Sequence, residues 1–184
     1  MRRPRLLTTD DWPESELRAA VLAGELVAVG ECWAATVEPQ DPALRAAATA
    51  WALPDRRLVA ATRTATWIWG GVSRPPLPHE CVVPKHVRLR VGTEVRLREV
   101  VLDPADVVVL ADLAVTRPER TALDLLRTPG PAAGRFDPQD EAAVRGLLDL
   151  GLVDVDRVTA RLQALEGVPM ARQALRRLSR IAAR

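Results

Sequence analysis

Residues 79–115 read HECVVPKHVRLRVGTEVRLREVVLDPADVVVLADLAV, and this stretch decides the fold class. Apolar and polar side chains alternate along it, which is the period of a strand with one buried face. Gly92-Thr93 supplies a turn between the two clearest alternating segments. Short strands are expected at 79–83, 87–91, 95–101, 107–110 and 113–115. The stretch predicts a short antiparallel β-meander whose exposed face carries Arg88, Arg90, Arg96 and Arg98.

The segments on both sides of the meander are typical of helices. Asp41-Pro42 and Asp137-Pro138 each combine a capping side chain with a proline suited to a first turn. Thr62, Thr116 and Asp154 are expected to cap further helices. Helices are predicted at 14–23, 43–52, 63–69, 117–127, 138–150, 155–165 and 169–184. The sequence therefore predicts an α+β protein, with a mixed core around the meander and with C-terminal helices.

The N-terminal residues predict a separate small unit. A polar segment at 7–12 is interpreted as a short helix, and Gly24 ends the amphipathic helix that follows it. Gly30-Glu31 then joins the strands of a β-hairpin. This is the order of a winged helix-turn-helix, in shortened form, and DNA contacts are expected from Arg2, Arg3, Arg5, Ser15 and Arg18. The expected domains are 1–38, winged-helix-like and DNA-binding, and 39–184. The alternative is a winged-helix remnant that packs on the rest of the chain without touching DNA.

Length and composition exclude several classes of protein. The chain has 184 residues, 48% of them hydrophobic and 27% charged, so it forms a packed core and is not globally disordered. Two cysteines exclude a disulfide-rich secreted scaffold. No apolar run approaches the roughly 20 residues that span a bilayer, and none of signal-peptide length follows the N-terminal arginines. We expect a cytoplasmic protein without a membrane partner.

Charge is nearly balanced overall, at +2, but it is uneven along the chain. Residues 1–36 carry four Arg against six carboxylates, 56–98 carry nine basic residues against two Glu, and 157–184 carry seven Arg against one Glu. Two basic zones favour an acidic partner, either nucleic acid or an acidic protein face. The alternative is a solvated arginine-rich surface. Arg88, Arg90, Arg96 and Arg98 are the candidate phosphate contacts of the core.

No arrangement of residues predicts an enzyme. Gly70-Gly71 lacks the Lys-Ser/Thr of a phosphate loop, and no Gly-x-Ser-x-Gly motif is present. A zinc site would have to use the two histidines and two cysteines, whose spacing matches no finger or ribbon. We therefore predict no catalytic residue, no metal and no cofactor. The candidates for such a site are His79, His86, Cys32 and Cys81.

Residues 112–126 favour a structural role. Arg120 and Asp124 lie four apart on one helix face and are expected to form an exposed ion pair worth about 0.5 kcal/mol. Leu123 and Leu126 are expected to bury against the sheet. Trp67 and Trp69 are expected in the core or an interface.

Four segments together resemble the AbiEi family, the antitoxins of type IV toxin–antitoxin systems, in its actinobacterial form. GELVAVGECW at 24–33 is similar to the family's wing, TRTATWIWG at 62–70 to one of its helices, and HECVVP at 79–84 to one of its strands. The strongest similarity is DLAVTRPERTALDL at 112–125, which matches the block Gly-Leu-Pro-Val-Thr-x-x-x-Arg-Thr-Leu-Leu-Asp-Leu. The chain departs from the pattern at Glu31, Thr66 and Trp69.

The resemblance implies a DNA-binding transcriptional regulator. Such a protein would bind operator DNA through its N-terminal winged helix and counteract a nucleotidyltransferase-like toxin. A related arrangement appends a repair-endonuclease-like domain, which is not expected here. The alternative function is a protein-interaction module that neutralises a partner and carries a vestigial winged helix. The operator, the toxin and the oligomeric state are not specified by the sequence.

Overall fold

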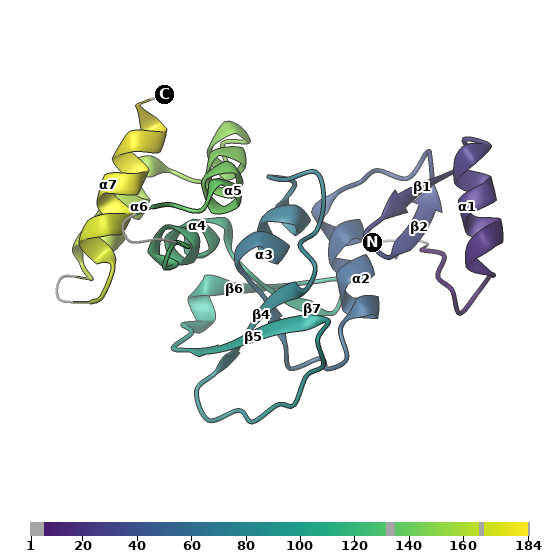
Figure 1. The fold of residues 1–184 in the computed structure, drawn as a ribbon, viewed down its shortest axis with the longest axis horizontal. Coiled ribbons are helices and arrows are strands. Elements are labelled where there is room, and N and C mark those ends of the chain that lie inside the picture. The colour runs from purple at the N-terminus through teal and green to yellow at the C-terminus, as the bar shows by residue number, and fades with distance from the viewer. Residues whose placement is uncertain (1–5, 132–134, 166–167, 184) are drawn as a thin grey trace.

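The computed structural model describes residues 6–131, 135–165 and 168–183, and they form an α+β fold as expected (Figure 1). The elements follow one another along the long axis of the molecule. The first helix and a two-stranded hairpin lie at one end, a five-stranded sheet lies in the middle, and the last four helices lie at the other end. Among the described residues, no helix is both long enough and apolar enough to cross a membrane.

The first end of the molecule, which we call the N-terminal lobe (residues 6–38), contains α1 (Glu14–Leu22), β1 (Leu26–Val29) and β2 (Cys32–Ala35). The antiparallel hairpin turns at Gly30-Glu31, as predicted, and Gly30 has a φ of 63° that suits glycine. The short helix expected at 7–12 is wrong. Leu7 is extended and pairs with Trp33 of β2, and turns lead from there to α1.

The larger sheet has the order β5-β4-β3-β7-β6 and is mixed. The antiparallel pairs are β3 with β4 and β6 with β7, whereas β4 and β5 run parallel, as do β3 and β7. The strands are β3 (Val59–Ala60), β4 (His79–Pro84), β5 (Val95–Val100), β6 (Val107–Leu110) and β7 (Leu113–Thr116); a 3-10 turn, η1 (Pro104–Asp106), precedes β6. The predicted hairpin of β6 and β7 is confirmed.

The strand expected at 87–91 is wrong. Residues 85–94 instead form a crossing connection, which brings the chain back so that β5 can start beside the start of β4. The alternation still reports burial correctly, since Val87, Leu89 and Val91 pack on the core while Arg88 and Arg90 are exposed. Alternating burial therefore does not require a hydrogen-bonded ladder.

The remaining helices mostly begin where the capping residues indicate. Asp41, Asp137 and Asp154 each accept a hydrogen bond from a first-turn backbone N–H. Thr62 and Thr116 do not cap, because Ala61 and Arg117 occupy those positions, and the last helix begins two residues after Pro169. The helices are α2 (Pro42–Ala52), α3 (Thr62–Trp69), α4 (Pro118–Arg127), α5 (Pro138–Asp149), α6 (Val155–Gln163) and α7 (Ala171–Ala182).

Two large hydrophobic cores hold these elements, and a smaller third cluster lies around Val59, Ala61 and Val82. The first joins the hairpin, α2, α3 and the sheet, and it contains Trp67 as expected. The second lies among α4, α5, α6 and α7. Leu123 and Leu126 belong to this second core, so they pack against helices and not against the sheet as predicted. Half-buried Trp69 contacts both cores, and its Nε1–H donates to the Thr116 carbonyl at 2.9 Å.

Gly71 and Gly146 bring the two cores together. The carbonyl of Gly71 lies so close to α5 that a Cβ on Gly146 would overlap its oxygen. A Cβ on Gly71 would lie 2.8 Å from Cγ2 of Thr66 and 3.2 Å from the backbone nitrogen of Leu147. Both positions therefore require the smallest residue, because backbone meets backbone there.

Candidate functional site

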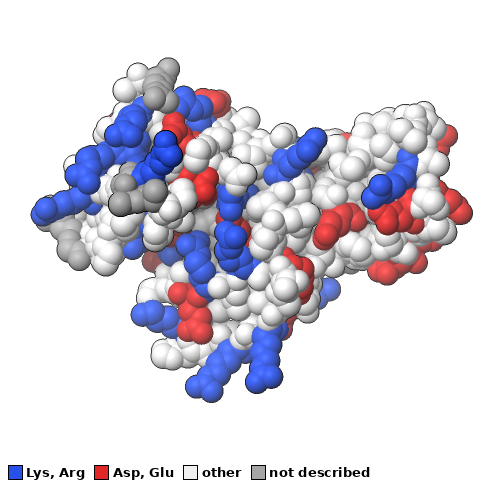
Figure 2. All heavy atoms as spheres, in the orientation of Figure 1, with Lys and Arg blue, Asp and Glu red and all other residues white. Residues whose placement is uncertain are grey.

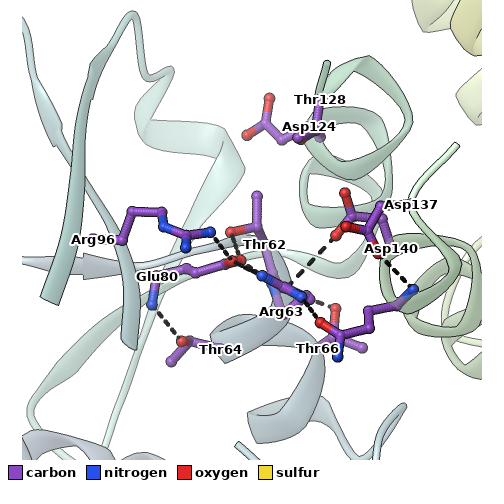
Figure 3. Close-up of polar contacts among 11 residues, drawn as sticks. Thr62, Arg63, Thr64, Thr66, Glu80, Arg96, Asp124, Thr128, Asp137 and Asp140 are labelled. Atoms are coloured by element: carbon purple, nitrogen blue, oxygen red, sulfur yellow. Dashed lines mark hydrogen bonds and ion pairs between the residues drawn. The ribbon is translucent and has the colours of Figure 1, made fainter. Parts of the chain in front are cut away.

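A polar pocket with a volume of about 420 Å³ lies where β4, β5, α3 and the start of α5 meet (Figure 3). Its centre is the carboxylate of Glu80, a buried residue of β4. The backbone N–H of Glu80 donates to Oγ1 of Thr64 at 2.8 Å, which fixes the strand to α3. The pocket is lined by Thr62, Arg63, Glu80, Arg96, Arg98, Thr128, Pro129, Gly130, Pro131, Asp137 and Asp140.

Glu80 acts as the missing cap of α3. The N-cap residue, Ala61, has no side chain that could accept a hydrogen bond. Oε2 of Glu80 instead accepts from the Thr62 hydroxyl at 2.6 Å and from the backbone N–H of Arg63 at 3.0 Å. A carboxylate is favourable there because the N-terminus of a helix carries partial positive charge.

Arg63 connects the sheet to α5. Its guanidinium donates to Oε1 of Glu80 at 2.6 Å, lies 3.6 Å from a carboxylate oxygen of Asp140, and donates to the side chain of Gln139. Arg96 approaches the same Glu80 carboxylate at 3.4 Å from β5, while most of its side chain remains exposed. Sequence reasoning missed this cluster, and the signal for it was a glutamate within a strand whose following residues are apolar.

The two central carboxylates are shifted in opposite directions. Burial raises the pKa of Glu80, but hydrogen bonds from Arg63 and Thr62 outweigh it, so that this pKa lies below its usual range. Burial also raises the pKa of Asp140, and the nearby carboxylates add to that effect, so that its pKa is about 6 in spite of Arg63. Two carboxylates that share one guanidinium, that of Arg63, can either bind a charged ligand or hold α3 and α5 together.

Replacing Asp140 with Asn should stabilise the protein above pH 6. The folded pKa of Asp140 exceeds its unfolded value, so its ionisation lowers stability as pH rises from about 4 to about 6. Asn carries no charge, and we expect a gain of about 1–3 kcal/mol at pH 7.5 with a smaller difference at pH 4. Urea unfolding at both pH values measures this, and a variant less stable than the wild type at pH 7.5 contradicts it.

The expected DNA contacts lie in two separate places. Arg96 and Arg98 project from the same face of β5, and exposed Arg88 and Arg90 precede them in the connection. Ser15 and Arg18 lie on α1 at the far end of the molecule, and Arg18 there pairs with Glu14 at 2.7 Å. Arg2, Arg3 and Arg5 lie outside the described residues. Figure 2 shows mostly acidic side chains over the N-terminal lobe, and many basic side chains with acidic ones among them over the rest of this face.

The histidines and cysteines do not gather into a metal site. Among the described residues, no group of three or more His, Cys, Asp or Glu side chains is placed to hold a metal ion. His79 is buried with neither ring nitrogen hydrogen-bonded, and burial lowers its pKa. Burial raises the pKa of both Cys32 and Cys81 to about 12, so neither thiol is a ready nucleophile. His86 is exposed in the connection after β4.

Comparison with known families identifies the core. The family model of the AbiEi antitoxin C-terminal domain matches residues 58–178, which is more than half of the chain and includes the polar pocket. The chain belongs to the AbiEi antitoxin family. The match supports an antitoxin-like role. No curated protein matches.

A solved structure is similar to this AbiEi chain over most of its length. The crystal structure of the RV2827C protein from Mycobacterium tuberculosis has 20% sequence identity and a TM-score of 0.48. The similarity covers 98% of this chain and 72% of that one.

A buried charge cluster joins the sheet of this AbiEi chain to its helices. The carboxylate of Asp106 in η1 forms ion pairs with two guanidiniums. Nη1 of Arg120 in α4 lies 3.0 Å from Oδ2, and Nη2 of Arg161 in α6 lies 2.8 Å from Oδ1. Arg120 also reaches Asp124 at 2.8 Å, so the predicted pair forms. The pair is buried and not exposed, because only 11% and 12% of the two side chains are accessible.

Proposed function

We propose that this AbiEi protein is an antitoxin that binds DNA and counteracts a nucleotidyltransferase-like toxin by binding and not by catalysis. The observation that carries the DNA proposal is a basic surface of five exposed cations on β5 and the connection before it. We define the basic surface as Lys85, Arg88, Arg90, Arg96 and Arg98. Arginine and lysine at such a surface supply the phosphate contacts on which non-specific affinity for DNA depends.

The N-terminal lobe is the weaker candidate for the first contact with phosphates. Its described residues include one arginine, Arg18, against seven carboxylates. Arg18 would have to leave Glu14 before it could bind a phosphate. Contacts by Ser15 and Arg18, and by Arg2, Arg3 and Arg5, remain predictions, as does the division of the chain into domains 1–38 and 39–184.

Reversing four charges of the basic surface tests the proposal. The variant Arg88→Glu, Arg90→Glu, Arg96→Glu, Arg98→Glu should bind the DNA upstream of its own gene at least tenfold more weakly at low salt, because repulsion replaces phosphate contacts. The wild-type affinity should fall steeply with salt, and the fall should be shallower in the variant. Fluorescence anisotropy of a labelled duplex measures both.

The control for this experiment is the variant Ser15→Ala, Arg18→Glu, which changes α1 alone. Equal binding by the fourfold variant and the wild type, together with a loss in the α1 variant, would move the DNA site to the N-terminal lobe. A wild-type protein that fails to bind the duplex at low salt contradicts DNA binding altogether. Circular dichroism of each variant checks that it is folded.

A second candidate function is a protein-interaction module that neutralises its partner by direct contact. Large apolar side chains that are exposed on the acidic N-terminal lobe favour it, since such patches mark contact surfaces. They are Trp12, Leu22 and Val37, with exposed fractions of 53%, 90% and 87%. Copurification with the product of a neighbouring toxin gene after nuclease treatment would support this function, and loss of the complex on that treatment would contradict it.

A further inference from the structure

The N-terminal lobe contains an apolar groove of about 490 Å³ between α1 and the hairpin. Leu17 on α1 and Leu26 on β1 contribute to it from opposite sides, and Trp12 stands at its edge with half of its side chain exposed. The volume falls in the range of sites that hold ligands or partner side chains, about 300–1,000 Å³. The groove is lined by Leu7, Trp12, Glu16, Leu17, Ala20, Glu25, Leu26, Ala35 and Glu38.

Among the described residues that line this groove, every charged side chain is acidic. Three glutamates, Glu16, Glu25 and Glu38, line it, and no lysine or arginine does among the described residues. Glu16 and Glu25 are exposed, and neither forms a side-chain ion pair with another of the described residues. Apolar walls between these carboxylates match a surface that is apolar in its centre and cationic at its flanks.

We propose that this groove binds a cationic amphipathic helix of a partner protein. Its apolar face would cover the half-buried Leu7 and Leu26 and contact Trp12, in the helix-in-groove mode of recognition. Its lysine or arginine side chains would reach the three glutamates at the rim. The inference deepens the second candidate function, since it names the kind of partner segment that the lobe accepts.

The chemistry of the groove disfavours the other occupants. DNA and anionic membranes carry negative charge, which the three rim glutamates repel. A second copy of this chain offers exposed cations on α7, at Arg172, Arg176 and Arg180. The apolar side of α7, however, is buried within its own bundle, where Ala174, Leu178 and Ile181 form part of the second core. While α7 stays packed, it therefore cannot present an apolar face together with these cations to a second copy of the chain.

A designed peptide tests the inference with the full chain. The probe is a synthetic 18-residue helix with leucine on one face and lysine on the other, titrated into the protein by calorimetry at 50 mM salt. We expect saturable one-to-one binding that weakens as salt is raised. A control peptide with the same leucines and with glutamate in place of lysine should not bind. Equal binding of both peptides would overturn the proposal, because apolar contact alone would then explain it.

Two variants place the peptide in the groove. Glu16→Lys, Glu25→Lys, Glu38→Lys should weaken binding at least tenfold, and Trp12→Ala, which leaves the charge unchanged, should weaken it several-fold. The matched control reverses three exposed carboxylates elsewhere, Glu99→Lys, Asp149→Lys and Asp156→Lys, and should bind within twofold of the wild type. Unchanged binding by the groove variants, or an equal loss in the control, would contradict the inference.

Two further outcomes separate this inference from its alternatives. We expect the free chain to stay monomeric in sedimentation at low salt. If the wild type self-associates and the groove variant does not, the groove binds a second copy of the chain and the proposal is wrong. If groove variants no longer bind the peptide but still protect against the toxin, the groove binds a cationic helix as proposed, but the toxin does not dock there. If the variants lose peptide binding, toxin protection and the toxin complex together, the result supports both the groove proposal and the second candidate function.

Discussion

Replacing Asp106 with Asn should lower the free energy of unfolding by about 3–5 kcal/mol, which is the cost of removing one partner from a buried ionic cluster. Asp106 holds two guanidiniums from two helices, and both would lose their charged acceptor at once. Arg120 is the more buried of the two arginines, so the loss of its charged acceptor should account for most of the destabilisation. Urea unfolding followed by circular dichroism measures the change.

Graded controls make this expectation specific to the cluster. Asp149→Asn alters an exposed carboxylate on α5 and should change stability by less than about 0.5 kcal/mol. Arg161→Gln should cost less than Arg120→Gln, because 39% of the Arg161 side chain is accessible against 11% for Arg120. A loss below about 1 kcal/mol for Asp106→Asn would mean that the cluster does not clamp the helices to the sheet.

Replacing Gly146 with Ala should destabilise the protein by about 2–3 kcal/mol, although helix propensity alone favours alanine by about 1 kcal/mol in a helix interior. Gly146 lies within α5, and its new Cβ would overlap the carbonyl oxygen of Gly71. Backbone cannot rotate away as a side chain can, so the two cores would have to separate. Helix propensity alone predicts a higher melting temperature for the variant, whereas the overlap with Gly71 predicts a lower one, so thermal unfolding distinguishes the two effects.

A glycine without such a neighbour supplies the control for this substitution. A Cβ on Gly151 would meet nothing within 4 Å, so only its φ of 65° opposes alanine there. Gly151→Ala should cost about 1 kcal/mol through backbone strain alone. A Gly146→Ala protein at least as stable as the wild type would show that Gly71 and α5 are not in close contact.

Local chemistry made much of the fold predictable. Asp41, Asp137 and Asp154 cap their helices as expected, because an N-cap depends on residues only two or three positions away. The hairpin around Gly30 follows from a turn of two residues. The alternation at 87–91 predicted correctly which side chains are buried, because that pattern also depends only on neighbouring residues.

Contacts between distant segments were not predictable. Parallel pairing of β5 with β4 requires the chain to cross back over ten residues, and no local pattern distinguishes that path from a hairpin. Glu80 caps a helix that begins 18 residues earlier, and Asp106 receives an arginine 55 residues later. The predicted pairing of Arg120 with Asp124 was right in geometry, but its burial depends on η1 and on α6.

The small interior of the N-terminal lobe has a consequence for how it behaves in solution. Leu17 is the one residue of α1 that is buried, so little apolar area holds this helix to the hairpin. The backbone amides of α1 should therefore exchange with solvent through openings that leave the two cores intact. A protein bound across α1 and the hairpin would suppress those openings, and part of its binding free energy would be spent in making the first helix as rigid as the rest.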